Sequence, residues 1–387
     1  MAGLSSLDDL INQVTVNGKF NRADWNKNHA VGGTVVAGSW QCLLGGAGNP
    51  PANSLLGSGT TLVQKPLYDF LAGGGSIQHG GPVAAAYNDF KTLLNASAFS
   101  AAATTVPCVL QLCDFLGYHT LTNATISTAG TKTMVNTEAV TFSSSSGLLM
   151  TTVADFDNYT PVSFSNSGGA LPTGLVAETI YWTIRVSATT SRLATTLADA
   201  IATTAIAFTD AGSGTNTMQV RLPRYSDGAG VQALLAASTA GTAGAGTFQL
   251  TYTNSVGTGS RTTPSSPALP TNTAVAPLLT VPYSGTGSGK FGPFFPLRGG
   301  DAGIRSIQNI ILGSAGVTTG VYNLIYAKPL LTLPITTLGV AAERDLVNQL
   351  PSMPRIYDGA CLGWNIYAGS AIPNNSSFFG HLDFGWA

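Results

Sequence analysis

The chain is dominated by short segments in which apolar and polar residues alternate, separated by clusters of Gly, Pro, Ser and Asn. Residues 248–252 show this pattern, and residues 304–312, 321–327 and 382–386 are further apolar segments of strand length. Alternation with a period of two is typical of a strand with one buried face. Short strands at regular spacing favour a sandwich or jelly roll over parallel strands linked by helices. We therefore predict a mainly β protein.

The chain divides into three segments by composition. Residues 1–121 are expected to form a partly helical, extended N-terminal region. Residues 122–219 are rich in Thr, Ser, Gly and Ala, and we interpret them as an inserted β-rich domain because the flanking segments resemble each other. Residues 220–387 are predicted to form a β-sandwich or jelly-roll-like domain. Within the insert, one strand is expected to bury the apolar face made by Ile180, Trp182, Ile184 and Val186.

Three segments have the spacing of a helix. Residues 7–14 follow a serine that can act as an N-cap, and Asn17-Gly18 is expected to end this helix. Residues 84–94 follow Pro82 with an apolar stripe, and residues 340–350 precede Pro351. The apolar residues 106–116 fit either a buried strand or a helix.

Charged residues are scarce in this chain. Lys and Arg (17) nearly balance Asp and Glu (18), and together they make up 9% of the residues, against roughly 25% in an average soluble domain. A nucleic-acid interface needs clustered Lys and Arg, so we expect no direct nucleic-acid partner. The N-terminus lacks a secretory signal pattern, and the longest apolar stretches are too short for a spanning helix, so no membrane association is expected. A surface so poor in charge predicts burial against partners.

The sequence singles out no catalytic, cofactor-binding or metal-binding residue. Residues 285–290 (GTGSGK) approach a phosphate-binding loop, but Ser284 replaces its first glycine and Phe291 replaces the hydroxyl residue that would bind magnesium. Asp155, Asp157 and Asn158 have the close spacing of calcium ligands without the required Gly and Glu, so turn chemistry is favoured. We predict that the protein is not an enzyme and has no cofactor.

Histidines and cysteines give no clustered pattern either. The chain has four histidines, and none has a second ligand residue at the spacing of a metal site. They are His29, His79, His119 and His381. The cysteines form no CxxC pair, and we interpret them as reduced, buried residues; they are Cys42, Cys108, Cys113 and Cys361.

The remaining charge is concentrated in residues 221–227 (RLPRYSD), 343–345 and 355–358 (RIYD). Arg and Tyr are enriched at interface hot spots, so these segments are candidates for contacts between subunits; an ion pair within the chain is the equally weighted alternative. The candidate interface residues are Arg221, Arg224, Tyr225, Arg344, Arg355 and Tyr357. The aromatic segment 291–296 (FGPFFP) is expected to belong to the core rather than to a docking patch.

Several phrases resemble structural proteins of tailed-bacteriophage virions. They lie in residues 222–230 (LPRYSDGAG), 300–307 (GDAGIRSI), 328–334 (KPLLTLP), 343–362 (ERDLVNQLPSMPRIYDGACL) and the C-terminal GHLDFGWA. The segment LPTGLVAETIYWTIRVSATTSRLA before FTDAGSG is similar to small β-modules inserted in phage head and tail proteins. The long charged helix common in major capsid proteins is missing from this pattern, which favours an accessory protein of the head.

The resemblance implies a structural component of a bacteriophage particle, with a capsid decoration or cement protein that binds the shell as an oligomer as the leading expectation. Its partners would be other copies of itself and other virion proteins, including the major capsid protein, in particles assembled in the host cytoplasm. The alternatives are a major capsid or tail and fibre-associated protein, or, in a different class, an exported adhesin or surface-layer protein.

Overall fold

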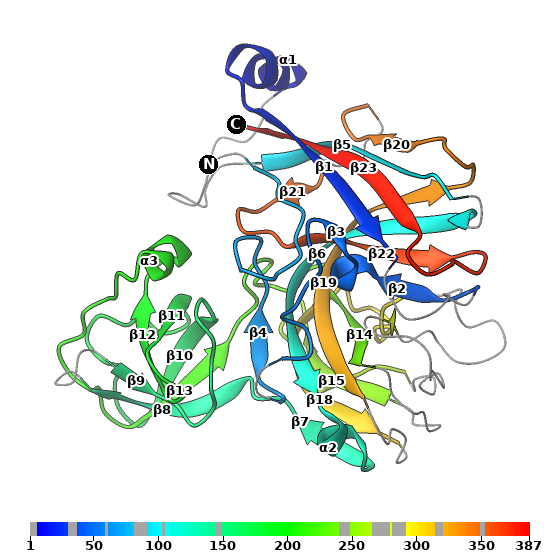
Figure 1. Cartoon of the computed structure of the whole chain (residues 1–387). Coiled ribbons are helices and arrows are strands. Elements are labelled where there is room, and N and C mark those ends of the chain that lie inside the picture. Colours follow the sequence, from blue (N-terminus) through cyan, green and yellow to red (C-terminus); the bar gives the residue numbers. More distant parts are fainter. Residues whose placement is uncertain are drawn as a thin grey trace.

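The computed structural model describes residues 6–29, 37–58, 61–80, 91–102, 105–143, 149–239, 248–264, 279–280, 292–313, 320–348 and 353–387. Within these residues the protein is mainly β, as the sequence predicts, with three sheets of six, seven and four strands and one separate closed barrel. Figure 1 shows the barrel, drawn in green, beside a body that contains the other sheets.

The first sheet has six strands in the order β20-β5-β23-β1-β3, with β21 also paired to β5. These strands are β1 (Phe20–Asn28), β3 (Gly48–Asn49), β5 (Lys91–Ser100), β20 (Ala342–Asp345), β21 (Arg355–Ile356) and β23 (Ser377–Trp386). The sheet therefore combines strands from both ends of the chain.

The second sheet has seven strands in the order β19-β14-β17-β2-β22-β6-β4, and β19 also pairs with β6. These strands are β2 (Trp40–Cys42), β4 (Gln64–Pro66), β6 (Cys108–Leu121), β14 (Gln232–Thr239), β17 (Leu279–Thr280), β19 (Val321–Ile335) and β22 (Leu362–Ala368). The third sheet, in the order β16-β15-β18-β7, has four strands: β7 (Gly130–Thr133), β15 (Phe248–Asn254), β16 (Arg261–Thr262) and β18 (Ile304–Leu312).

Two long antiparallel strands, β6 and β19, connect the cores of the body. One half of β6, with Leu110 and Leu112, packs against the six-stranded sheet in a core that also contains Trp25 and Trp364. The other half, with Leu116 and Leu121, packs against the four-stranded sheet in a second core. The run 106–116, which the sequence leaves open between strand and helix, therefore contributes to a strand.

The barrel has the order β10-β11-β12-β9-β8-β13 and its own apolar core. Its strands are β8 (Thr137–Ser143), β9 (Leu149–Thr151), β10 (Pro161–Ser167), β11 (Tyr181–Arg185), β12 (Thr190–Ala194) and β13 (Thr215–Val220). The sequence predicts that Val186 is buried and that Tyr181 lies on the other face of this strand. This prediction is wrong in part, because Tyr181 belongs to the barrel core and Val186 is 54% exposed. Closure turns alternate residues inward, and this leaves Trp182 half-buried on the other face.

Helices are short in the described residues. The helix expected after Ser6 is present as α1 (Leu7–Ile11), which continues as a π-helix over Asn12–Val16 and ends at Asn17. The others are a 3₁₀-helix at Leu43–Gly45, α2 (Asn123–Ile126) and α3 (Leu197–Ile201). The rest of the described N-terminal region supplies β1 to β6 rather than further long helices.

Two predicted helices are wrong where the structure describes them. Residues 91–94 begin β5, which pairs with β23 on one side and with β20 and β21 on the other. Residues 342–345 form β20 on the edge of the same sheet. In both segments the backbone hydrogen bonds go to neighbouring strands, so tertiary pairing overrides local helical spacing. Residues 84–90 of the first predicted helix lie outside the described residues.

Candidate functional site

The connection from the barrel to the body positions several of the candidate residues. β13 ends at Val220 and β14 begins at Gln232, so residues 221–231 leave the barrel and turn onto the body. Tyr225 has a left-handed backbone conformation with φ of 51°, which is uncommon outside glycine. The N–H of Gly228 donates to the Tyr225 carbonyl at 2.7 Å and closes the turn. This turn holds the ring of Tyr225 edge-on to Tyr357, with the centroids 5.0 Å apart.

Two cations stack on this tyrosine pair. The guanidinium carbon of Arg355 lies 4.4 Å from the centroid of the Tyr357 ring, and Lys328 Nζ lies 5.1 Å from that of Tyr225. Such contacts are favourable because the ring face carries negative charge density. The structure thus brings together three predicted residues, Tyr225, Arg355 and Tyr357, and adds Lys328, which sequence reasoning missed.

A cleft of about 490 Å³ lies beside these rings, between barrel and body. We call it the barrel–body cleft. Ile180 and Trp182 line it from the barrel side, whereas residues 222–227 and Ala229 with Lys328 and Tyr357 line it from the body side. Lys328 Nζ donates to the Ala229 carbonyl at 2.6 Å, and burial lowers the Lys328 pKa. The cleft offers aromatic faces together with one ammonium and one carboxylate, that of Asp227, which suits binding a partly polar surface.

The segment that contains β4 holds the barrel against the body. Lys65 Nζ donates to the Asp157 carboxylate at 2.6 Å, and the Tyr68 hydroxyl donates to the Tyr159 carbonyl at 2.9 Å. Phe70 packs edge-on against the Tyr159 ring at 5.5 Å. Asp157 is therefore a partner in an ion pair, which agrees with a structural role for the DFDN segment.

Arg224 lies beneath the barrel–body cleft and not on the surface. Its Nε and Nη2 donate to the two Asp114 carboxylate oxygens at 2.9 and 2.6 Å. Further bonds of 3.1 Å reach the carbonyls of Leu67 and Phe115. The Arg224 and Asp114 side chains are 3% and 1% exposed. Of the two interpretations of this residue, the ion pair within the chain is therefore the one that its contacts favour.

The other two candidates are separate from this cluster. Arg221 Nε donates to Ser163 Oγ at 2.8 Å, and its Nη2 is paired with Glu178, so its guanidinium is tied to the barrel side. Arg344 lies on the edge strand β20, is exposed, and contacts the Thr332 carbonyl at 3.4 Å. Arg344 therefore stays available to a partner.

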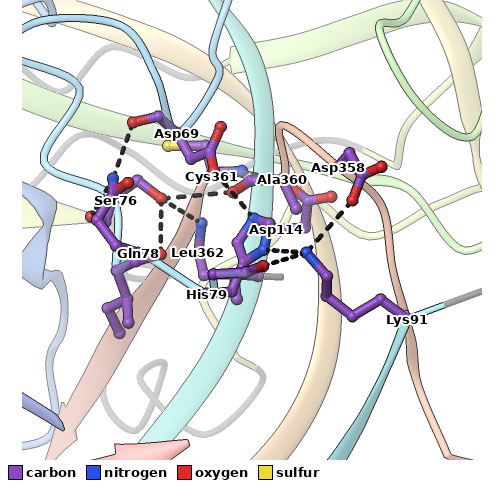
Figure 2. Close-up of polar contacts among 12 residues, drawn as sticks. Asp69, Ser76, Gln78, His79, Lys91, Asp114, Asp358, Ala360, Cys361 and Leu362 are labelled. Carbon is purple, nitrogen blue, oxygen red and sulfur yellow. Dashed lines mark hydrogen bonds and ion pairs between the residues drawn. The ribbon is translucent and has the colours of Figure 1, made fainter. Parts of the chain in front are cut away.

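A buried polar network lies around Asp114, the partner of Arg224, and Figure 2 shows Asp114 together with the other residues of this network. Lys91 Nζ is 3.0 Å from His79 Nδ1 and 3.3 Å from an Asp358 carboxylate oxygen. His79 Nε2 is 3.2 Å from an Asp69 oxygen. Asp114 also accepts the Cys361 N–H at 3.0 Å. These residues come from separate parts of the sequence, so the network ties residues 69–79 and the segment that precedes β22 to β5 and β6.

Burial sets the protonation of this network. Burial lowers the pKa of His79 to about 3, helped by the Lys91 ammonium, and raises the pKa of Asp69 to about 6. His79 is therefore neutral at pH 7, so its ring can accept a hydrogen bond from the Lys91 ammonium. His79 and Lys91 are at most 2% exposed, which makes the network a support for the cleft rather than a surface that a substrate reaches.

The cysteines and the described phenylalanines of the aromatic segment singled out in the sequence lie in the core. All four cysteines are free and buried, as predicted. Phe294 and Phe295 belong to two cores, so the core interpretation of their segment is confirmed for this pair. Residues 285–290 lie outside the described residues. Within the described part of the chain, no group of three or more His, Cys, Asp or Glu is arranged to hold a metal ion.

No family model, curated protein or solved structure matches the chain. Among the described helices, none has the length and apolar character needed to cross a membrane.

Proposed function

We propose that the protein is a structural component of a bacteriophage particle, namely a capsid decoration or cement protein that binds the shell as an oligomer. Its partners are other copies of itself and the major capsid protein, in particles assembled in the host cytoplasm. The proposal keeps a jelly-roll-like arrangement, in which strands from residues 1–121 pair with strands from residues 220–387 in the same sheets. It starts from the phage-like sequence phrases described above.

The observation that carries the proposal is that the chain has few charges and that several of them are paired within the chain. Within the described residues, at least seven Lys and Arg side chains form ion pairs with acids of the same chain; they are Arg22, Lys65, Lys91, Arg185, Arg221, Arg224 and Arg261. A surface with little free charge loses little solvation free energy when it is covered. Such a surface suits dense packing against neighbouring subunits.

The N-terminal helix gives further support. Leu10 of α1 is buried, and Leu10 and Val14 lie over Gly385 of β23. Leu7 and Ile11, one turn apart, are 57% and 48% exposed. This exposed apolar stripe can be covered when the protein binds a neighbour in a particle.

The direct test is mass spectrometry of purified particles of the phage that encodes this chain, with copy counting against the shell protein. A copy number close to that of the shell protein supports a decoration or cement role. A handful of copies would instead place the chain in the tail or fibre, and its absence from particles would reject the virion assignment.

A further inference from the structure

Two stacked phenylalanines form an apolar platform on the outer face of the six-stranded sheet. Phe99 of β5 and Phe379 of β23 lie directly opposite each other in the strand register. Their rings are stacked, with centroids 5.5 Å apart and planes inclined by 25°. Both side chains are half-buried, whereas their neighbours Ala98 and Phe378 are fully buried in the core below. The rings therefore leave one side open to solvent.

A groove of about 350 Å³ runs beside the platform. We call it the sheet-face groove. Gly380 follows Phe379 on β23, and a Cβ atom there would lie 1.9 Å from the Ser97 carbonyl oxygen and 2.9 Å from the Trp25 ring. Glycine is therefore required where β5 and Trp25 approach β23 so closely.

Polar groups surround the platform. Asp24 of β1 is exposed and lies opposite His381 in the register. Asn49 of β3 donates from its N–H to Asn26 Oδ1 at 2.6 Å, which fixes the amide side chain of Asn26 at the rim. His381 Nε2 is buried, lies 3.8 Å from an Asp383 oxygen, and has no hydrogen-bond partner in the described residues. The rim thus combines hydrogen-bond donors and acceptors.

We propose that the sheet-face groove binds a carbohydrate. A sugar ring has apolar C–H faces that stack on aromatic rings and a rim of hydroxyls that both donate and accept hydrogen bonds. The groove has the matching features: stacked rings on its floor, and carboxylate, amide and imidazole groups at its edge. Its volume is within the range of small-ligand pockets. This inference does not rest on the proposed role in a virion, because all the residues that line the groove belong to this chain.

The groove binds rather than cleaves its ligand. Glycoside cleavage requires a second free carboxyl group near the first. Asp383 lies on the same face as Asp24, two residues along β23 from His381, and Arg22 holds both of its oxygens at 2.7 and 2.9 Å. Asp383 is therefore already committed to an ion pair and does not serve as the second acid.

The test is binding of the purified full chain to an array of defined hexose and N-acetylhexosamine oligosaccharides, followed by calorimetry with the best-bound oligosaccharide. We expect Phe99→Ala and Phe379→Ala each to weaken binding by about fivefold, as for loss of one aromatic contact. Asp24→Asn, a change of similar size at an exposed site, is expected to weaken binding as well. The control is Phe20→Ala, because Phe20 is 40% exposed on β1 but does not line the groove.

Two results of the binding experiments would overturn the proposal, and a third comes from sedimentation. One is no retained oligosaccharide on the array and no saturation-transfer signal at millimolar sugar. The other is a bound sugar whose affinity is the same in Phe379→Ala, Asp24→Asn and the Phe20→Ala control. The third is measured by sedimentation velocity. If the unmodified chain is a dimer that dissociates in Phe379→Ala, a second copy covers the groove. That result would also reject the carbohydrate assignment.

Discussion

Replacing Arg224 with methionine removes the cation from the buried pair beneath the barrel–body cleft. In the unmodified chain, Arg224 satisfies both oxygens of Asp114 and two backbone carbonyls. After the change, Asp114 keeps the N–H of Cys361 as its donor among the bonds described here. The side chain of Asp114 is 1% exposed, so water does not replace the lost partner.

The expected cost follows from this geometry. Removing one partner of a buried ion pair leaves an uncompensated charge, and the free energy of unfolding falls by about 3–5 kcal/mol. Arg221 provides a matched control, since its partner Glu178 is 64% exposed. For Arg221→Met we expect a loss of about 0–1 kcal/mol, as is typical of solvent-exposed pairs.

The double variant Arg224→Met/Asp114→Leu separates the cost of an unpaired charge from the value of the pair. Removing both charges leaves no buried ion, so we expect the double variant to recover most of the stability lost in Arg224→Met. The measurement is urea unfolding at pH 7, followed by tryptophan fluorescence and far-ultraviolet circular dichroism, because coincident transitions support a two-state treatment.

The reasoning is refuted if Arg224→Met lowers stability by no more than Arg221→Met does. It is also refuted if the double variant is less stable than Arg224→Met, because the unpaired carboxylate would then not be the source of the loss.

Three further predictions concern stability and reactivity. Burial lowers the pKa of His119 to about 4. The contribution of neutral His119 to stability is therefore complete above the unfolded pKa of about 6.5 and is lost as the pH falls toward 4. The urea midpoint should decrease over this pH interval, and it should decrease less in His119→Gln. A Cβ on Gly303 would lie 2.0 Å from the Gly228 carbonyl oxygen, whereas Gly299 has nothing within 4 Å, so Gly303→Ala should lower the unfolding free energy by about 1–3 kcal/mol and Gly299→Ala should melt like the unmodified chain. Burial raises the pKa of Cys42, Cys108 and Cys361 to about 12, so a disulfide reagent should modify four thiols after unfolding and react slowly with the native chain; rapid native reaction would contradict this.

The sequence predicted strands best where alternation and pairing agree. Residues 248–252 alternate in sequence, and β15 has the same alternating burial in the structure. Prediction failed at residues 91–94 and 342–345, where charged or apolar residues have helical spacing but the backbone pairs with distant strands. Local propensity is a fraction of a kcal/mol per residue, so partners contributed by another part of the chain decide the outcome.

The candidate site was also predicted only in part from the sequence. Arg and Tyr near residues 221–227 and 355–358 stood out in sequence because charge is so scarce, and the structure brings Tyr225, Arg355 and Tyr357 together. Trp182 was expected to point into the core, so its place in the barrel–body cleft was missed. No sequence signal shows that β11 belongs to a closed barrel, where the alternate face is the inner one.

The amino-acid pattern alone determined the β class, the serine cap of α1, the buried reduced cysteines and the scarcity of charge, because each depends on residue type and near neighbours. Tertiary structure decided which face of β11 is buried, that Arg224 pairs with Asp114 at a separation of 110 residues, and that Phe99 and Phe379 stack across strands. These features depend on the register between distant strands. That register is fixed by hydrogen bonds and packing across the whole fold, which the spacing of neighbouring residues does not encode.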